Sequence, residues 1–264
     1  MIQMLTTLWR YRHFVVTSIR AELQGRFARS RLGTLWWVLH PLTQAAIFAL
    51  VLSEVMGARL PHAQSRAAYP IYLMAGMAAW GLFSEILNRC MTVFIEYSGT
   101  LKKISFPRLC LPLIVWGSAL VNHALLLLAI AVVFLFFGHY PAVTWLVLPL
   151  GIVLISMFAF GLGVLLGIFN VFSRDVAQVI SVVMQIWFWM TPVVYSYEVV
   201  PERFRWITAI NPLAPLVRIY QDALLFHRWP DFGLLWPPAV VATGLFLLSF
   251  IVFRRASAEL VDAL

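Results

Sequence analysis

The chain has 264 residues, of which 62% are hydrophobic and only 11% are charged, whereas soluble domains are about half apolar and about a quarter charged. A water-facing domain of this length could not bury so much apolar side chain under so few charges, so lipid is the solvent for most of the chain. The 19 basic residues outnumber the 11 acidic ones, and in so hydrophobic a chain this surplus favours a cytoplasmic membrane face over nucleic acid.

The first predicted element is an amphipathic helix that precedes any span. Its apolar positions recur every four residues, with arginines on the other faces, and they are Tyr11, Val15, Ile19, Leu23 and Phe27. This pattern is typical of a helix that lies in the inner membrane interface, and a helix docked on a cytoplasmic partner would look the same. The first thirty residues have no small-residue cleavage pattern, so we expect no secretory signal peptide.

Three arginines, Arg26, Arg29 and Arg31, lie directly before the first predicted span. They are candidates for contact with lipid head groups or with the phosphate of a lipid-linked substrate, because guanidinium groups bind phosphate with two parallel hydrogen bonds. As a basic flank on the cytoplasmic side they also need no further role.

Six segments are long and apolar enough to cross a bilayer, which takes about 20 residues. They are residues 32–56, 69–95, 109–137, 145–172, 176–194 and 232–253. No internal repeat or low-complexity linker interrupts them. We therefore expect an all-α membrane protein with one domain over residues 1–264, made of an interface helix (1–31), a six-span bundle (32–253) and a tail (254–264).

The distribution of Lys and Arg sets the expected orientation. With the N-terminus inside, twelve basic residues fall on the cytoplasmic side and six on the outer side. Both termini are therefore expected in the cytoplasm. The two cysteines, Cys90 and Cys110, then lie toward the reducing side, and two cysteines exclude a disulfide framework.

Charged residues within spans are costly and are by default candidates for function. Glu85 and Arg89 lie four residues apart in the second predicted span, so they share a helical face. They could line a polar conduit, but an internal ion pair that neutralises itself is the interpretation we favour. In the fourth span, Gly161, Gly163 and Gly167 indicate close helix packing.

Aromatic residues gather at and after the end of the fifth predicted span. The candidates for a channel or gate surface among them are Trp187, Trp189, Tyr195 and Tyr197. Most aromatics near span ends form the interfacial belt, and for any one ring that interpretation is preferred. As a group, these rings could instead offer apolar faces with polar edges to a sugar chain.

Residues 195–231 are too polar to span cleanly, yet they carry many apolar side chains. We predict two short helices, at about 202–210 and 216–225, broken by Asn211 and Pro212. Irregular backbone at membrane depth is tolerated only where protein or a water-filled cavity covers it. The pair is therefore predicted to be re-entrant from the outer side and to act as a gate.

The sequence carries no motif for nucleotide or metal chemistry. It contains no G-x-x-x-x-G-K-[ST] loop, no H-E-x-x-H and no C-x-x-C, and its six histidines are scattered. We therefore expect no cofactor, no metal and no enzyme activity on this chain, and an energy source elsewhere. The rival hypothesis is a membrane enzyme that acts on a lipid carrier. Such an enzyme would need carboxylates or histidines together at one membrane face, whereas Glu54, Glu85 and Glu96 are spread over two spans.

Four blocks of sequence resemble the membrane subunits of bacterial ABC exporters of cell-surface polysaccharides. They are RFARSRLGTLWWVLHPL (26–42), NVFSRDVAQVI (170–180), WFWMTPVVY (187–195) and NPLAPLVRIYQDALL (211–225). Each block alone is weakly specific, but together they occur in the family's order and cover nearly the whole chain. The runs ARSRLG and FRRASAELVDAL look nearest to the O-antigen branch.

The resemblance implies six spans, an N-terminal interface helix and two short re-entrant helices before the last span. It also implies that two copies pair with two ATPase subunits, which bind the ATP, and that a channel forms between the copies. The cargo would be a polysaccharide on a lipid carrier. Undecaprenyl-pyrophosphate-linked O-antigen is the expected cargo, with lipid-linked capsule polysaccharide, teichoic acid or a small drug as alternatives.

If a separate ATPase drives the protein, cytoplasmic loops must receive its force. The best candidate is the segment 99–107 with Lys102, Lys103 and Phe106, followed by the turn at Arg174 and Asp175. Both segments could equally be solvated basic loops.

Overall fold

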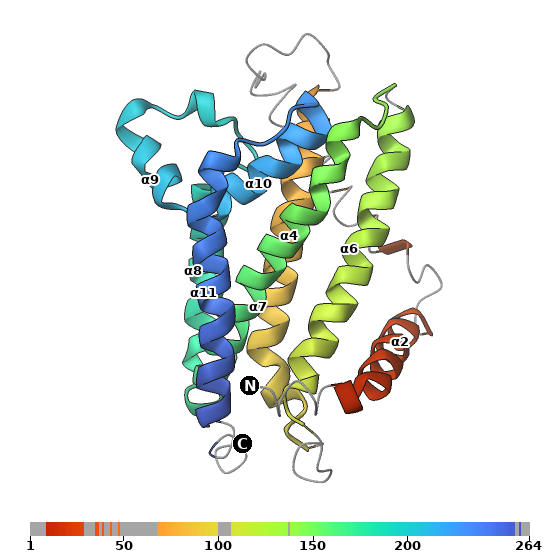
Figure 1. The fold of residues 1–264 in the computed structure, drawn as a ribbon, viewed down its shortest axis with the longest axis vertical. Helices are drawn as coiled ribbons and strands as arrows, with labels where there is room; N and C mark the ends of the chain where they lie inside the picture. Colours follow the sequence, from red (N-terminus) through yellow and green to blue (C-terminus); the bar gives the residue numbers. More distant parts are fainter. Residues whose placement is uncertain are drawn as a thin grey trace.

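The computed structural model describes residues 9–28, 68–99, 107–136 and 138–256, together with the single positions 35, 36, 39, 43, 47 and 259. Every regular element in these residues is a helix (Figure 1). The long helices are α2 (Arg12–Ala28), α4 (Ala68–Glu96), α6 (Cys110–Phe136), α7 (Leu148–Phe172), α8 (Asp175–Met190) and α11 (Phe232–Ala256). The short ones are α9 (Arg205–Ile210), α10 (Leu213–Gln221), 3-10 turns at Val143–Val147, Tyr197–Val199 and Glu202–Phe204, and a π-helical turn at Asp222–Phe226.

Four helices of the described chain are long and apolar enough to cross a membrane. They are Ala68–Glu96, Cys110–Leu135, Val143–Phe172 and Phe232–Ala256, and they match the second, third, fourth and sixth predicted spans. The first predicted span, residues 32–56, lies almost entirely outside the described residues. The predicted total of six spans therefore stays a prediction.

The fifth predicted span is a helix, but a shorter one than expected. Helix α8 has 16 residues and is therefore about 24 Å long, against about 30 Å for the hydrocarbon core. It ends at Met190 because Thr191 is extended, with φ −99° and ψ 130°. The following Pro192 enforces this, since a residue before proline is pushed out of the helical region.

Helix α4 is the centre of the bundle. It packs against α7, α6 and α10, and α11 covers α7 on the other side. Figure 1 shows α2 beside the lower half of α6, at the end of the bundle where α11 finishes, and α9 and α10 at the opposite end. The short helices before α11 therefore lie at the other end of the bundle from α2.

The predicted pair of short helices before the last span is present. A 3-10 turn and α9 together cover residues 202–210, as predicted, and α10 covers Leu213–Gln221. Helix α10 begins three residues earlier than predicted because Pro215 falls in its first turn, where a missing backbone N–H is harmless. Whether the pair is re-entrant stays a prediction.

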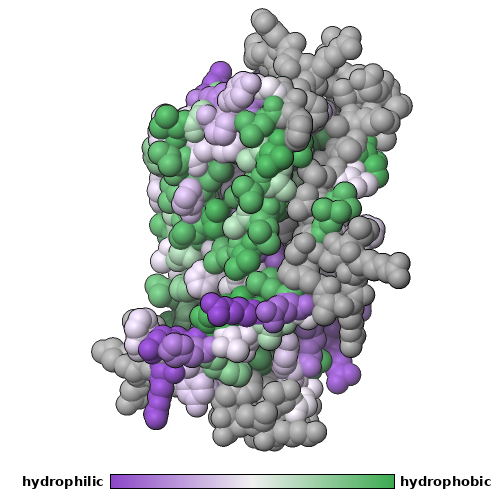
Figure 2. Space-filling model, turned by 90° about the vertical axis from the view of Figure 1, so that its right-hand side faces the viewer, coloured by the Kyte–Doolittle hydropathy of each residue, from purple (hydrophilic) through white to green (hydrophobic). Residues whose placement is uncertain are grey.

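The outer surface suits an apolar solvent. Figure 2 shows hydrophobic residues over the middle of one face and hydrophilic residues gathered toward its two ends. Large apolar side chains are also exposed along two of the long helices, on α8 at Val179, Val182, Ile186 and Trp189, and on α11 at Leu234, Trp236, Val240 and Ile251. Such surfaces face lipid or another apolar helix rather than water.

The glycines of α7 lie where neighbouring helices approach it most closely. A Cβ on Gly161 would stand 2.6 Å from the backbone of Leu245 in α11, and one on Gly167 would stand 2.6 Å from the carbonyl oxygen of Cys90 in α4. A Cβ on Gly163 would stand 2.9 Å from the side chain of Cys90. The prediction that these glycines allow close helix packing is confirmed.

A Gly167→Ala substitution is expected to lower the thermal unfolding midpoint of the detergent-solubilised protein. The new methyl would meet backbone, which cannot rotate away, so α4 must shift, at a cost of about 1–3 kcal/mol. Gly244→Ala in α11 is the matched control, because a Cβ there meets nothing within 4 Å. It should leave the midpoint unchanged or raise it slightly, since alanine favours a helix by about 1 kcal/mol. Equal midpoints for the two variants would contradict the packing described for α7.

Candidate functional site

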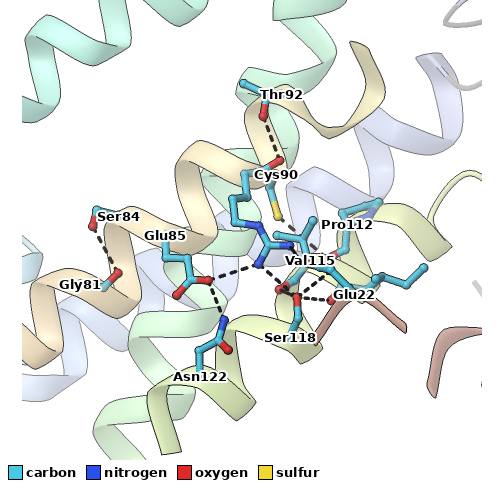
Figure 3. Close-up of polar contacts among 12 residues, drawn as sticks. Glu22, Gly81, Ser84, Glu85, Cys90, Thr92, Pro112, Val115, Ser118 and Asn122 are labelled. Carbon is cyan, nitrogen blue, oxygen red and sulfur yellow. Dashed lines mark hydrogen bonds and ion pairs between the residues drawn. The ribbon is translucent and has the colours of Figure 1, made fainter. Parts of the chain in front are cut away.

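Helices α2, α4 and α6 meet at a group of polar side chains, which we call the inner polar cluster. Its members are Glu22 of α2, Glu85 and Arg89 of α4, and Ser118 and Asn122 of α6 (Figure 3). Arg89 Nη1 lies 3.2 Å from Glu85 Oε1 and 3.1 Å from Ser118 Oγ. Arg89 Nη2 donates to Glu22 Oε1, forming a second ion pair.

Further contacts link the two carboxylates to α6. Asn122 Nδ2 donates to Glu85 Oε1 at 2.9 Å, and Ser118 Oγ lies 3.1 Å from Glu22 Oε2. Ser118 and Asn122 are buried, whereas the side chains of Arg89, Glu85 and Glu22 keep 22%, 23% and 16% of their surface exposed. The charged groups are therefore only partly withdrawn from solvent.

The sequence placed Glu85 and Arg89 on one helical face, and the structure brings them together. It also adds Glu22 and Ser118, which the sequence did not single out. The spacing rule for helices finds partners within one helix only, and Glu22 is 67 residues away from Arg89 along the chain. The one available signal was that Glu22 is an acid on an otherwise basic helix.

A cavity of about 460 Å³ lies beside the inner polar cluster. Glu22 and Arg89 form part of its wall, and apolar side chains of α2, α4 and α6 form much of the rest, including Phe14, Val93, Leu111, Ile114 and Val115. Glu96 also lines it, two helical turns beyond Arg89 on α4. The three helices therefore do not close fully around the charged side chains.

A second polar group lies at the opposite end of the bundle, where α8 gives way to the short helices. Buried Asn211 is its centre. Asn211 Oδ1 accepts hydrogen bonds from Trp187 Nε1 at 2.9 Å and from the Leu213 amide at 3.0 Å, and Asn211 Nδ2 donates to Thr191 Oγ1 at 2.8 Å. This side chain therefore ties the end of α8 to the start of α10, and we call these residues the Asn211 joint.

The backbone turn after α8 is held by side chains from α4 and α10. The Tyr72 hydroxyl lies 2.9 Å from the Tyr195 carbonyl oxygen, and the Tyr69 hydroxyl donates to the Val194 carbonyl at 2.8 Å. Gln221 Nε2 donates to the Pro192 carbonyl at 2.9 Å. These contacts supply the partners that buried carbonyls outside a helix require, so the turn is fixed in place.

The four aromatic candidates fall into two environments. Trp187 is half-buried, with its ring 5.2 Å from that of Phe83 in an edge-on contact. Trp189 and Tyr197 are 58% and 39% exposed, and half-buried Tyr195 donates to the Trp189 carbonyl at 2.8 Å. Trp187 therefore packs within the bundle, and the exposed rings of Trp189 and Tyr197 remain the candidates for contact with a sugar chain.

Pro212 lines an apolar cavity of about 350 Å³ between α7, α8 and α11. Its other walls include Phe158, Ile180, Met184, Trp187, Val241 and Leu245. The lining carries no charged side chain among these residues. It is a gap in the packing of the thinly covered helix α8.

Burial shifts the pKa values of two titratable side chains near α10. Desolvation raises the pKa of Asp222, and the Arg218 guanidinium, whose Nε lies 3.3 Å from Asp222 Oδ2, opposes that shift. Burial and the neighbouring His139 ring, stacked at 4.6 Å, lower the pKa of His227. The His139–His227 contact joins two segments far apart in the sequence, whereas Asp222 pairs with Arg218 on the preceding turn of the same helical run.

The candidates for coupling and for phosphate contact are only partly visible. Arg174 and Asp175 are exposed, and Asp175 begins α8, where a negative charge suits the helix dipole. Arg26 lies in the last turns of α2. The predicted residues Arg29, Arg31, Lys102, Lys103 and Phe106 lie outside the described part of the chain. Among the residues that are described, no three His, Cys, Asp or Glu side chains gather as a metal site would require.

Comparison with known proteins gives a consistent set of similarities. The model of the ABC-2 type transporter family matches residues 14–225. The O-antigen export system permease protein RfbA of Klebsiella pneumoniae is 30% identical over 218 residues, which is 80% of each chain. The protein of that name from Myxococcus xanthus is 26% identical over 266 aligned positions covering all of both chains. The polysialic acid transport protein KpsM of Escherichia coli is 20% identical over 77% of this chain and 78% of its own.

Proposed function

The chain belongs to the ABC-2 type transporter family, and from that premise we propose that it is the membrane-spanning subunit of an exporter of O-antigen polysaccharide. The observation that carries the proposal is its similarity, over the full length of both chains, to a permease named for O-antigen export. The bundle of apolar helices is in keeping with such a subunit.

ATP hydrolysis is proposed to take place on a separate ATPase chain. The sequence offers no P-loop, and the family is one of ATP-driven transporters, so the energy must be delivered through contacts. In this proposal two copies of the chain pair with two ATPase subunits, and the cargo passes between the copies. The turn at Arg174 and Asp175 and the segment with Lys102, Lys103 and Phe106 are the proposed contacts.

The cargo is proposed to be carried on undecaprenyl pyrophosphate in a bacterial inner membrane. Arg26, Arg29 and Arg31 are the proposed contacts for its phosphates, because guanidinium groups recognise them well. With both termini in the cytoplasm, α2 and the end of α11 would lie on that side, which is in keeping with their place at one end of the bundle (Figure 1). The exposed rings of Trp189 and Tyr197 would then lie toward the outer side, where the sugar chain leaves.

Capsule polysaccharide is the second candidate cargo. The similarity to a polysialic acid transport protein favours it over teichoic acid or a small drug. Its identity of 20%, against 30% and 26% for the O-antigen permeases, places it behind O-antigen. A membrane enzyme acting on a lipid carrier is a weaker alternative, because these relatives are named as permeases or transport proteins.

Two measurements test the proposal together. Deleting the gene should remove O-antigen from the cell surface while lipid-linked O-antigen accumulates inside, because synthesis continues without export. The purified protein with its ATPase partner in liposomes should hydrolyse ATP several-fold faster when undecaprenyl-pyrophosphate-linked O-antigen is added. A lipid-linked capsule glycan serves as the comparison.

Intact surface O-antigen in the deletion strain, together with hydrolysis that no lipid-linked glycan changes, would show the proposal to be wrong. Faster hydrolysis with the capsule glycan alone would move the assignment to the second candidate.

A further inference from the structure

The guanidinium of Arg89 is shared by three helices. Its Nη1 contacts Glu85 of the same helix at 3.2 Å and Ser118 of α6 at 3.1 Å, and its Nη2 contacts Glu22 of α2. Two carboxylates, one from α4 and one from α2, therefore share this one group. A guanidinium suits such a shared position because it is planar and carries several N–H donors in fixed directions, whereas a lysine ammonium is a compact charge without that geometry.

Among the described residues, helix α2 also packs along α6, where a Cβ on Gly117 would collide with the side chain of Ile19. Several other residues of α2 are exposed, namely Arg12, His13, Val16, Thr17 and Arg20. The polar contact between Glu22 and Arg89 joins α2 to α4, in addition to the packing of α2 on α6.

The charges make the docking of α2 depend on Arg89. Glu22 and Glu85 flank one guanidinium, so the three groups together carry one net negative charge. Removing the guanidinium would take a positive charge from between two carboxylates in a partly desolvated place, which weakens the link between α2 and α4. Because these side chains keep 16–23% of their surface exposed, the pairing is weaker than a buried one and can be broken.

The position along α4 also matters. Arg89 lies seven residues before Glu96, the last residue of α4, which places it about 10 Å from that end of the helix. A helix lying in the membrane interface sits about 5–10 Å into that boundary. The cavity of about 460 Å³ beside Arg89 leaves space between α2 and the spans, so a small movement of α2 need not be blocked by packing.

We propose that Arg89 is a positioning residue that latches α2 to α4 and α6, so that displacement of α2 moves both helices. This inference rests on the proposed function, because a separate ATPase gives a reason for α2 to be displaced. Glu85 and Ser118 orient the guanidinium, and Glu22 is the group that is held. The role proposed for Arg89 is thus mechanical.

The test uses the full protein with its ATPase partner and separates docking from coupling. Docking is measured by the rate at which a maleimide labels an introduced Ile19→Cys, since Ile19 is half-buried against Gly117; native Cys90 and Cys110 are buried. Coupling is measured as the stimulation of ATP hydrolysis by undecaprenyl-pyrophosphate-linked O-antigen. The variants are Glu22→Gln, Arg89→Gln, the two combined, and Arg89→Lys.

Glu22→Gln is expected to speed labelling about tenfold, a value between those for exposed and buried pairs, and to abolish stimulation while basal hydrolysis persists. The combined variant should show the same labelling rate and the same stimulation as Arg89→Gln alone, because each single substitution already removes the Glu22–Arg89 contact. Arg89→Lys should restore part of the stimulation. Glu96→Gln is the matched control, an exposed acid on the same helix and cavity, and should behave as wild type in both measurements.

An unchanged labelling rate in Glu22→Gln would overturn the proposal that Arg89 holds α2 through Glu22. Faster labelling with normal stimulation would show a purely structural contact and overturn the positioning role. If the wild-type protein itself is not stimulated, the proposed function fails, and the labelling rates still decide whether Arg89 holds α2.

Discussion

An Asn211→Leu variant is expected to lose at least about nine-tenths of O-antigen export while still inserting into the membrane. Leucine has a similar size but cannot accept a hydrogen bond, so the Trp187 indole N–H and the Leu213 amide both lose their acceptor. Each buried donor left unpaired costs about 1–3 kcal/mol, which is a large part of a membrane bundle's stability. The end of α8 would no longer be fixed to the start of α10.

The measurement combines surface O-antigen, membrane content of the protein and the thermal unfolding midpoint in detergent. Asn88→Leu is the matched control, because Asn88 is an exposed asparagine on α4 and the same substitution there removes no buried bond. It should leave all three values near those of wild type. If Asn211→Leu gave the same export and the same unfolding midpoint as Asn88→Leu, the Asn211 joint would have no part in holding α10 to the end of α8.

The spans could be predicted because each one is a local signal. A run of about 20 apolar residues must be satisfied within its own helix, whatever packs against it. The same holds for the short helices around Asn211 and Pro212, since proline acts on its own backbone. The end of α8 was missed by four residues because hydropathy continues through Val193 and Val194, whereas Pro192 stops the helix at Met190.

The contacts within the candidate site could not be read in the same way. Arg89 and Glu22 come together only because α2 folds back against α6, and no local pattern encodes that packing. The aromatic group shows the same limit. Trp187 and Trp189 are two residues apart and look alike in the sequence, yet one donates to buried Asn211 and the other is 58% exposed. Helix rotation decides between them, and tertiary packing sets the rotation.

Reversing both charges of the predicted coupling segment, Lys102→Glu with Lys103→Glu, is expected to abolish export while ATP hydrolysis by the complex persists. The two lysines follow α4, which ends at Glu96, and α6 begins at Cys110, so they belong to the connection between two long helices. If an ATPase surface meets this connection, like charges placed there cost several kcal/mol and lower productive contact about tenfold or more. Export is read from surface O-antigen, and coupling from hydrolysis with and without the lipid-linked glycan.

The control must separate a specific contact from a general need for positive charge on the cytoplasmic side. Arg254→Glu with Arg255→Glu makes the same change in charge at the end of α11, which lies at the same end of the bundle as α2. Both double variants weaken the basic bias that sets orientation, so membrane insertion is measured for each. Specific coupling requires that the lysine reversal stops export and leaves insertion intact, while the arginine reversal changes neither. Equal loss in both would mean that the lysines act only as part of a basic membrane face, and the coupling contact would then have to be sought at Arg174 and Asp175.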